Sequence, residues 1–172
     1  AASASAKSAS RFATCCASRN GCRTGTARMN SSVSRNHDPA KLWEQALGAY
    51  TNKDYDHSIK LLQAVLVRAP RFAEAHHLVG VCYLMQNKHA DAERCIRKAL
   101  SVKKNAEFYA NLGLALQQSG NADGAAEAYS ASLALDPSSF RICNNLGNIY
   151  FKLNRHEEAV ALYRQAIPHQ PN

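Results

Sequence analysis

The side chains that could act in acid–base or metal chemistry are dispersed along this chain of 172 residues. Of the seven histidines, only His76 and His77 are neighbours. Adjacent positions of a helix point about 100° apart, which is a poor arrangement for two ligands of one metal ion. The six cysteines form no CxxC pair and no Cys/His cluster at zinc spacing. The sequence therefore predicts no metal site and no cofactor.

Neighbouring acidic residues are the remaining candidates for catalysis. The pairs Glu157-Glu158 and Asp54-Tyr55-Asp56 are expected at helix starts, where negative charge interacts favourably with the helix dipole. No GxSxG, phosphate-binding loop, GxGxxG or HExxH pattern occurs. We therefore expect no active site in these residues, and a protein that binds rather than catalyses.

The net charge of +8 is concentrated at one end of the chain. Residues 1–37 carry six basic and no acidic side chains, whereas the remaining fifteen basic residues face all thirteen acidic ones, leaving +2. This balance argues against a basic nucleic-acid face on the folded part. No stretch is apolar enough for membrane insertion.

Residues 1–37 are rich in Ser, Ala and Arg and lack hydrophobic periodicity, which predicts a disordered tail. Four interpretations of the tail stay open. The tail is an organellar transit peptide, an internal piece of a longer product, a segment in which residues 1–28 precede the true start at Met29 and are not natural, or a plain disordered tail. The free cysteines Cys82, Cys95 and Cys143 favour a reducing compartment. We expect a cytoplasmic location, or an organellar one if the tail is a transit peptide.

The rest of the chain contains an internal repeat. Five residues recur 34 positions later: Leu112, Gly113, Ala125, Tyr129 and Pro137 match Leu146, Gly147, Ala159, Tyr163 and Pro171. A backward step of 33 gives Val79, Gly80, Ala92 and Ile96, with Lys104 in place of the proline. Apolar residues within each unit follow the three- and four-residue spacing of short helices, and no strand-like alternation appears.

An earlier, fourth unit is less regular. A further step of 34 gives Ser58, Leu62, Val65 and Pro70 for its second half. Its first half aligns best at a spacing of 33, which puts Trp43 opposite His76 and Leu47 at the glycine position. We therefore predict that the turn of the first hairpin is one residue shorter than the others.

The repeated residues suggest how two helices pack within one unit. Close approach needs small side chains, so we expect Gly113 to face Ala125, and Gly147 to face Ala159. Residues Asn87, Gly120 and Asn154 are expected in the left-handed conformation that ends a first helix. Prolines Pro137 and Pro171 are expected to end second helices.

This pattern resembles the tetratricopeptide repeat family over residues 40–172. The resemblance implies an all-α, right-handed superhelix of about four helical hairpins, a solenoid whose first helices line a concave groove. The units are expected at about 39–72, 73–105, 106–139 and 140–172, within an array that spans 38–172. The function implied is a scaffold that binds a protein or an extended peptide.

By the same resemblance, the groove-facing residues can be named. The candidate binding residues are His77, Asn111, Gln117, Arg141, Asn144, Asn145, Asn148 and Lys152. A carboxamide has both donors and an acceptor, so a ladder of asparagines could hold a peptide backbone of any sequence. Solvation of an exposed helix face is the alternative role.

Two more specific family functions can be compared with these residues. The carboxylate clamp that binds chaperone tails in this family uses Lys, Asn and Arg at set groove positions. It is not expected here, because the corresponding positions hold Glu44, Gly48 and Leu78. The run Cys-Asn-Asn-Leu-Gly-Asn at 143–148, with the related runs before it, is similar to the repeats of O-linked N-acetylglucosaminyltransferases. The alternative function is therefore substrate recruitment for a glycosyltransferase domain outside this chain.

The last unit is expected to expose an apolar edge. Residues Val160, Leu162, Tyr163 and Ile167 belong to its second helix, after which no polar capping helix follows in the sequence. This arrangement predicts self-association through the fourth unit. It also suggests a fragment of a longer repeat protein.

Overall fold

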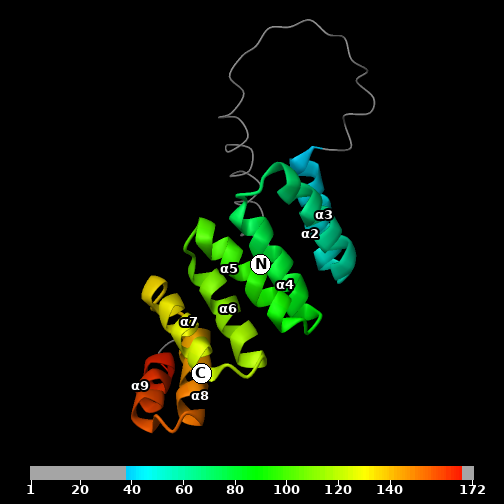
Figure 1. Cartoon of the computed structure of the whole chain (residues 1–172). Coiled ribbons are helices and arrows are strands. Elements are labelled where there is room, and N and C mark those ends of the chain that lie inside the picture. The colour runs from blue at the N-terminus through cyan, green and yellow to red at the C-terminus, as the bar shows by residue number, and fades with distance from the viewer. Residues whose placement is uncertain (1–37, 168–172) are drawn as a thin grey trace, which may run out of the picture. The chain divides into compact units, whose positions relative to one another are not determined.

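The computed structural model describes residues 38–167, in which eight α-helices and no strand occur (Figure 1). The helices are α2 (Pro39–Thr51), α3 (Tyr55–Arg68), α4 (Ala73–Met85), α5 (His89–Val102), α6 (Ala106–Gln118), α7 (Ala122–Leu135), α8 (Phe140–Lys152) and α9 (His156–Ala166). The all-α fold expected from the sequence is confirmed. The predictions of disorder and of a transit peptide concern residues 1–37, which lie outside the described residues.

The chain divides into two compact units between Ala75 and His76. In the first unit, α2 and α3 pack against each other as a helical hairpin. In the second unit, α6 packs with α5 and α7, and α8 packs with α7 and α9 (Figure 1). Helix α4 begins three residues before the division and continues into the second unit.

The helix bounds correct the register predicted for the first hairpin. Helices α2 and α3 begin 34 residues before α4 and α5, and the turn at 52–54 has three residues, like the turns at 86–88, 119–121 and 153–155. Ala46, rather than Leu47, therefore occupies the glycine position. The prediction of a shorter first turn is wrong. The shorter spacing of 33 arises between α5 and α6, where three residues connect the helices instead of four.

Each of the four hairpin turns contains one residue with positive φ. These residues are Lys53 (62°), Asn87 (59°), Gly120 (84°) and Asn154 (59°). The left-handed conformation predicted for the last three is confirmed. Lys53 adopts it as well, although a lysine has no intrinsic preference for this region.

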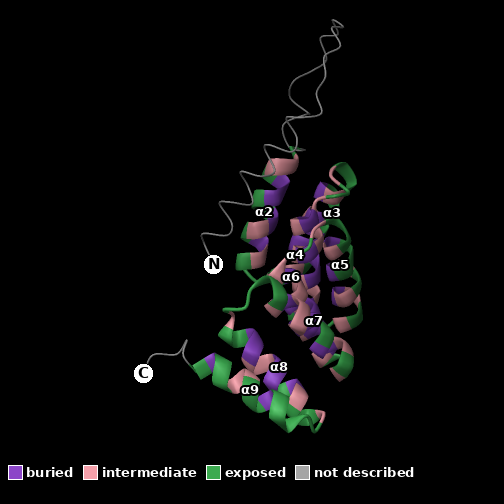
Figure 2. Ribbon diagram, turned by 90° about the vertical axis from the view of Figure 1, so that its left-hand side faces the viewer, coloured by how far each residue is buried: buried purple, intermediate pink, exposed green. Residues whose placement is uncertain are grey.

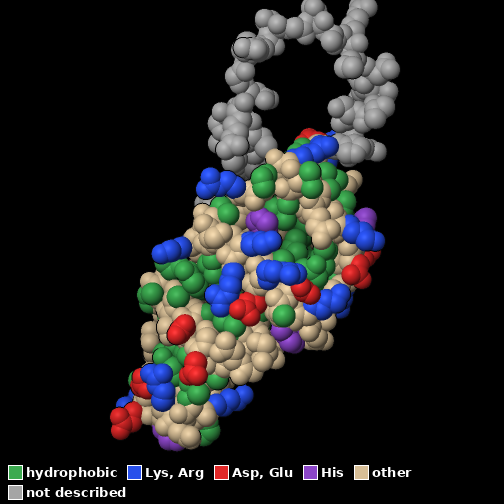
Figure 3. Space-filling model, viewed as in Figure 1, with side chains coloured by type: hydrophobic (Ala, Val, Ile, Leu, Met, Phe, Trp, Pro, Cys, Tyr) green, Lys and Arg blue, Asp and Glu red, His purple; other side chains and the backbone are tan. Residues whose placement is uncertain are grey.

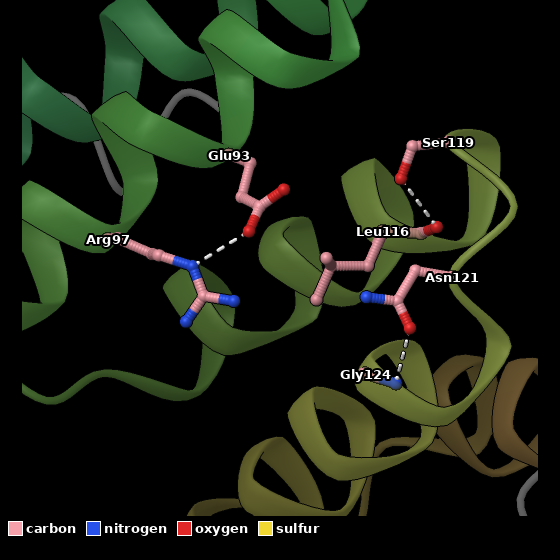
Figure 4. Close-up of polar contacts among 6 residues, drawn as sticks. All are labelled: Glu93, Arg97, Leu116, Ser119, Asn121 and Gly124. Atoms are coloured by element: carbon pink, nitrogen blue, oxygen red, sulfur yellow. Dashed lines mark hydrogen bonds and ion pairs between the residues drawn. The ribbon is translucent and has the colours of Figure 1, made fainter.

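Side-chain caps fix several helix starts. Asn121 Oδ1 accepts a hydrogen bond of 3.0 Å from the backbone N–H of Gly124 at the start of α7 (Figure 4). Asp54 Oδ1 accepts a hydrogen bond of 3.1 Å from the backbone N–H of His57 at the start of α3. Asp56 lies in the first turn of the same helix. Glu157 and Glu158 lie in the first turn of α9, so the helix-start role predicted for these acidic pairs is confirmed.

The side chain nearest to each repeated glycine is a large one and not the small one predicted. A Cβ at Gly113 would lie 2.6 Å from the ring of Tyr129, and one at Gly147 would lie 2.6 Å from the ring of Tyr163. The glycine therefore makes room for the large side chain that lies four residues after the repeated alanine, Ala125 or Ala159. In α4 the same space is taken by Ile96, 2.5 Å from a Cβ at Gly80.

The buried hydrophobic residues of each unit are mainly small or branched side chains, and Figure 2 marks the buried positions along the helices. Free thiols contribute to it, because Cys82 is 0% and Cys143 1% exposed, and burial raises the pKa of the Cys143 thiol. Cys95 is only half-buried. Within residues 38–167, no helix has the combined length and apolar character of a membrane span.

Candidate functional site

The eight candidate residues lie on first helices of the repeats. His77 is on α4, Asn111 and Gln117 are on α6, and the remaining five are on α8. Their exposure differs: Arg141, Asn148 and Lys152 are exposed, the other amides are half-buried, and His77 is buried at 9% exposure. The structure therefore presents the carboxamides, and not the imidazole, to the surface.

Tyr129 brings three of the candidate residues together. Its ring is 0% exposed on α7, and its hydroxyl donates a 2.9 Å hydrogen bond to Gln117 Oε1 on α6. Asn145 and the Arg141 guanidinium, both on α8, lie close enough to the same hydroxyl to favour its ionised form. Burial raises the pKa of Tyr129 to about 12, although Arg141 and Asn145 both oppose the shift. The neutral hydroxyl thus joins two neighbouring repeats.

Tyr163 performs the matching role in the last repeat. Its hydroxyl donates a 2.8 Å hydrogen bond to Asn148 Oδ1 on α8. Asn148 is exposed, and this bond uses one lone pair of its amide oxygen.

His77 orients the amide of Asn111. Asn111 Nδ2 and His77 Nε2 are 2.8 Å apart, and the imidazole stacks on the Phe108 ring at a centroid distance of 4.3 Å and an interplanar angle of 24°. An amide N–H donates, so His77 Nε2 acts as the acceptor in this arrangement. The contact joins α4 to α6.

The structure does not gather all eight residues at one point. Arg141 and Lys152 lie near opposite ends of α8, about 16 Å apart along the helix axis. Asn144 is half-buried between them. The candidate site is therefore an extended strip along α6 and α8 and not a compact pocket.

Sequence reasoning missed the tyrosine hydroxyls as the groups that orient the amides. Sequence analysis identified Tyr129 and Tyr163 as repeated positions and assigned their hydroxyls no role. A signal was present, because a buried tyrosine normally needs a hydrogen-bond partner for its hydroxyl, and the amides are the nearest polar residues on the adjacent helices.

The described surface carries mixed charge. Basic and acidic side chains are interspersed on the face shown in Figure 3. Several pair along a helix, as Arg97 Nε does with Glu93 Oε1 at 2.9 Å on α5 (Figure 4). Among the described residues, no group of three His, Cys, Asp or Glu side chains is placed to hold a metal ion.

The model of the tetratricopeptide repeat matches residues 44–110 and 110–172. The chain belongs to the tetratricopeptide repeat family. The crystal structure of MamA has the same fold, with a TM-score of 0.75 at 22% identity over 77% of this chain and 78% of MamA. The expected tetratricopeptide solenoid class is confirmed.

Two curated relatives are longer proteins. The chain is 27% identical over 118 residues to the protein O-mannosyl-transferase TMTC1 of Mus musculus, covering 66% of this chain and 12% of that protein. It is 25% identical over 118 residues to the BBSome complex member BBS4 homolog of Drosophila melanogaster, covering 67% and 24%. The narrower resemblance to O-linked N-acetylglucosaminyltransferases has weak support, since the transferase among these relatives is named for mannose transfer.

Proposed function

We propose that this scaffold binds an extended peptide segment of a partner protein along α6 and α8. The observation that carries the proposal is the orientation of three carboxamides by neighbouring side chains. His77 holds Asn111, Tyr129 holds Gln117, and Tyr163 holds Asn148. Asn145 lies near the Tyr129 hydroxyl as well.

Fixed amides lower the cost of binding. A mobile asparagine loses rotamer entropy when it binds a ligand, whereas one already hydrogen-bonded to a neighbour has lost most of it. Each amide has two N–H donors and two acceptor lone pairs, so one intramolecular bond leaves sites for a peptide N–H or C=O. In this proposal His77 positions Asn111 and does not meet the peptide, because its ring is covered.

Charged residues would add a preference for acidic peptides at α8. Arg141 and Lys152 are its only charged side chains and both are exposed. Exposed ion pairs contribute about 0.2–1 kcal/mol each, so they bias the choice of peptide without dominating its affinity.

The proposed activity is non-catalytic and does not involve nucleic acid. The assignment of the amides to binding supports a non-catalytic role. The mixed charge of the face in Figure 3 supports the absence of a nucleic-acid partner. We place the protein in a reducing compartment such as the cytoplasm, since the thiols of Cys82 and Cys143 are free and buried. Self-association through the fourth repeat stays a prediction, which sedimentation of the whole chain would test.

Binding would be tested with random twelve-residue peptides displayed on phage and selected on the whole chain. Selected peptides would be titrated by calorimetry against the Asn145→Ala/Asn148→Ala variant. We expect affinity to fall about tenfold, because two hydrogen bonds of about 0.5–1.5 kcal/mol are lost.

The matched control is Gln63→Ala, which removes an exposed carboxamide from the second helix α3. This variant should bind with unchanged affinity. Equal loss in both variants, or no loss in the double variant with its helical circular dichroism intact, would contradict the proposed site.

A second candidate is the recruitment of polypeptide substrates for a glycosyltransferase. It is favoured by the similarity to TMTC1, whose name is that of a transferase acting on proteins. The intact mass of the natural protein decides, because this function requires a catalytic domain in the same or a tightly bound chain.

A further inference from the structure

The first turns of α6 and α8 carry opposite charges at the same repeat position. Glu107 is the second residue of α6, and Arg141, which lies 34 residues later, is the second residue of α8. Both side chains are exposed. Glu107 is exposed although α7 and α8 follow it, so this position is open inside the array. Within residues 38–167, neither side chain forms an ion pair.

Each of these charges lies one helical turn before an amide of the candidate site. Asn111 follows Glu107 by four residues on α6, and Asn145 follows Arg141 by four residues on α8. Residues i and i+4 share one face of a helix, with Cβ atoms about 5–6 Å apart. A peptide backbone that contacts the two amides therefore passes an acid on α6 and a base on α8.

The other charges of the two helices do not cancel this pattern. Glu107 is the only charged residue of α6, and Lys152, the second charged residue of α8, is also basic. Lys103, Lys104 and Asp136 have the opposite signs, but they lie in the connections before the two helices and outside the strip. Across the strip, the charge thus changes from negative on α6 to positive on α8.

The separation of the two helices sets the spacing of the matching charges. Side chains of both helices approach the Tyr129 hydroxyl, which is 2.9 Å from Gln117 Oε1 on α6 and close to Asn145 on α8. Packed helices whose side chains meet have axes about 8–10 Å apart. A polyproline II segment repeats its side-chain direction every three residues, over about 9 Å, and leaves its backbone groups free for hydrogen bonds. Its residues i and i+3 therefore match the two helices.

We propose that the strip selects extended segments with one basic and one acidic residue three positions apart. The basic residue lies beside Glu107, and the acidic residue lies beside Arg141. This selectivity rests on the proposed binding of a peptide by the amides, which hold a backbone of any sequence. An exposed ion pair changes affinity by up to about fivefold, so the charges choose among peptides that the amides already bind.

The test is a selection of random twelve-residue phage peptides, run in parallel on the whole natural chain and on two variants. The natural chain should enrich a basic and an acidic residue three positions apart, in either order along the peptide. Glu107→Lys should enrich two acidic residues at this spacing, because both helices are then basic. Arg141→Glu should enrich two basic residues.

A titration would measure the preference directly. One peptide selected on the natural chain, and the same peptide with its basic residue changed to glutamate, would be compared by calorimetry. The natural chain should bind the first about threefold more tightly or better, and Glu107→Lys should reverse the order. Both differences should disappear in about 0.5 M salt. Glu127→Lys on α7 and Lys98→Glu on α5 change the net charge equally at exposed positions of second helices and should keep the natural order.

The possible failures can be told apart. Selected peptides without the charge pattern, whose affinity still falls with Asn145→Ala/Asn148→Ala, would refute the charge selectivity and leave the proposed function standing. A reversal of the preference by Glu127→Lys would assign the effect to net charge and refute it as well. Peptides that bind the natural chain and the amide variant equally would refute the proposed function, and the charge selectivity with it.

Discussion

The ring of Tyr129 packs directly on the backbone of Gly113, where a Cβ would lie 2.6 Å from its Cδ1 and Cε1 atoms. The tyrosine cannot retreat, since its side chain is fully buried and its hydroxyl is hydrogen-bonded to Gln117 at 2.9 Å. This pair and its counterpart Gly147–Tyr163 set how closely the two helices of a hairpin approach.

Substitution of this glycine should therefore destabilise the fold although alanine favours helix. We expect Gly113→Ala to lower the free energy of unfolding by about 1–3 kcal/mol, the usual cost of overpacking a core. Urea denaturation followed by circular dichroism measures the change. The control is Gly48→Ala in α2, where a Cβ meets nothing within 4 Å; this variant should gain up to about 1 kcal/mol from helix propensity. A stable Gly113→Ala variant would refute the packing role.

The buried hydroxyl of Tyr129 predicts a dependence of stability on alkaline pH. Its pKa is raised to about 12 in the folded chain, whereas the unfolded chain ionises near the ordinary value of 10.0. Between these values the unfolded state binds fewer protons than the folded state, so stability falls as pH rises through this window. The Tyr129→Phe variant lacks this contribution.

The measurement is the difference in unfolding free energy between the natural chain and Tyr129→Phe from pH 8.5 to 12. At pH 8.5 the natural chain should be more stable by about 1 kcal/mol, because its hydroxyl makes a hydrogen bond to Gln117. The advantage should shrink steadily above pH 10. A difference independent of pH would show that the hydroxyl is not desolvated.

The first hairpin turn contains an avoidable strain. Lys53 has φ of 62° in the place where the third turn has Gly120. A residue with a Cβ pays about 1–2 kcal/mol for this conformation, so Lys53→Gly should stabilise the chain by about 1 kcal/mol. Lys60→Gly, in the interior of α3, should instead destabilise it by about 1 kcal/mol. If both changes destabilise the chain to the same extent, the left-handed turn is not the source of strain.

Much of the fold was predictable because the repeated residues pack against each other within one hairpin. Gly113 and Tyr129, Gly147 and Tyr163, and the turn residues depend on nothing outside their own unit, so their spacing gives the helices directly. The first hairpin was misaligned for a physical reason. Helix α2 has the exposed residues Lys41 and Gln45 where later first helices have apolar residues, so the pattern that fixes register is missing there.

The candidate site was predictable in its residue types but not in its contacts. The family resemblance indicated which first-helix positions carry Asn111, Asn145 and Asn148. The contacts that orient them, from His77 and the two tyrosines, depend on rotamers and helix crossings that spacing does not encode. His77 illustrates the difference. Its position on a first helix was expected to face the groove, but its ring is buried by stacking on Phe108.

Each of the four hairpin turns has the same length and contains one left-handed residue. The connections between hairpins vary in length. A gene duplication or deletion whose breakpoints fall within two of these turns therefore leaves a complete turn at the junction. Joining Asn87 to Asn121, for instance, removes one repeat and brings α4 together with α7, which supply Gly80 and Tyr129 for the usual glycine contact. Recombination at the turns would let such a gene gain or lose binding units without designing a new junction.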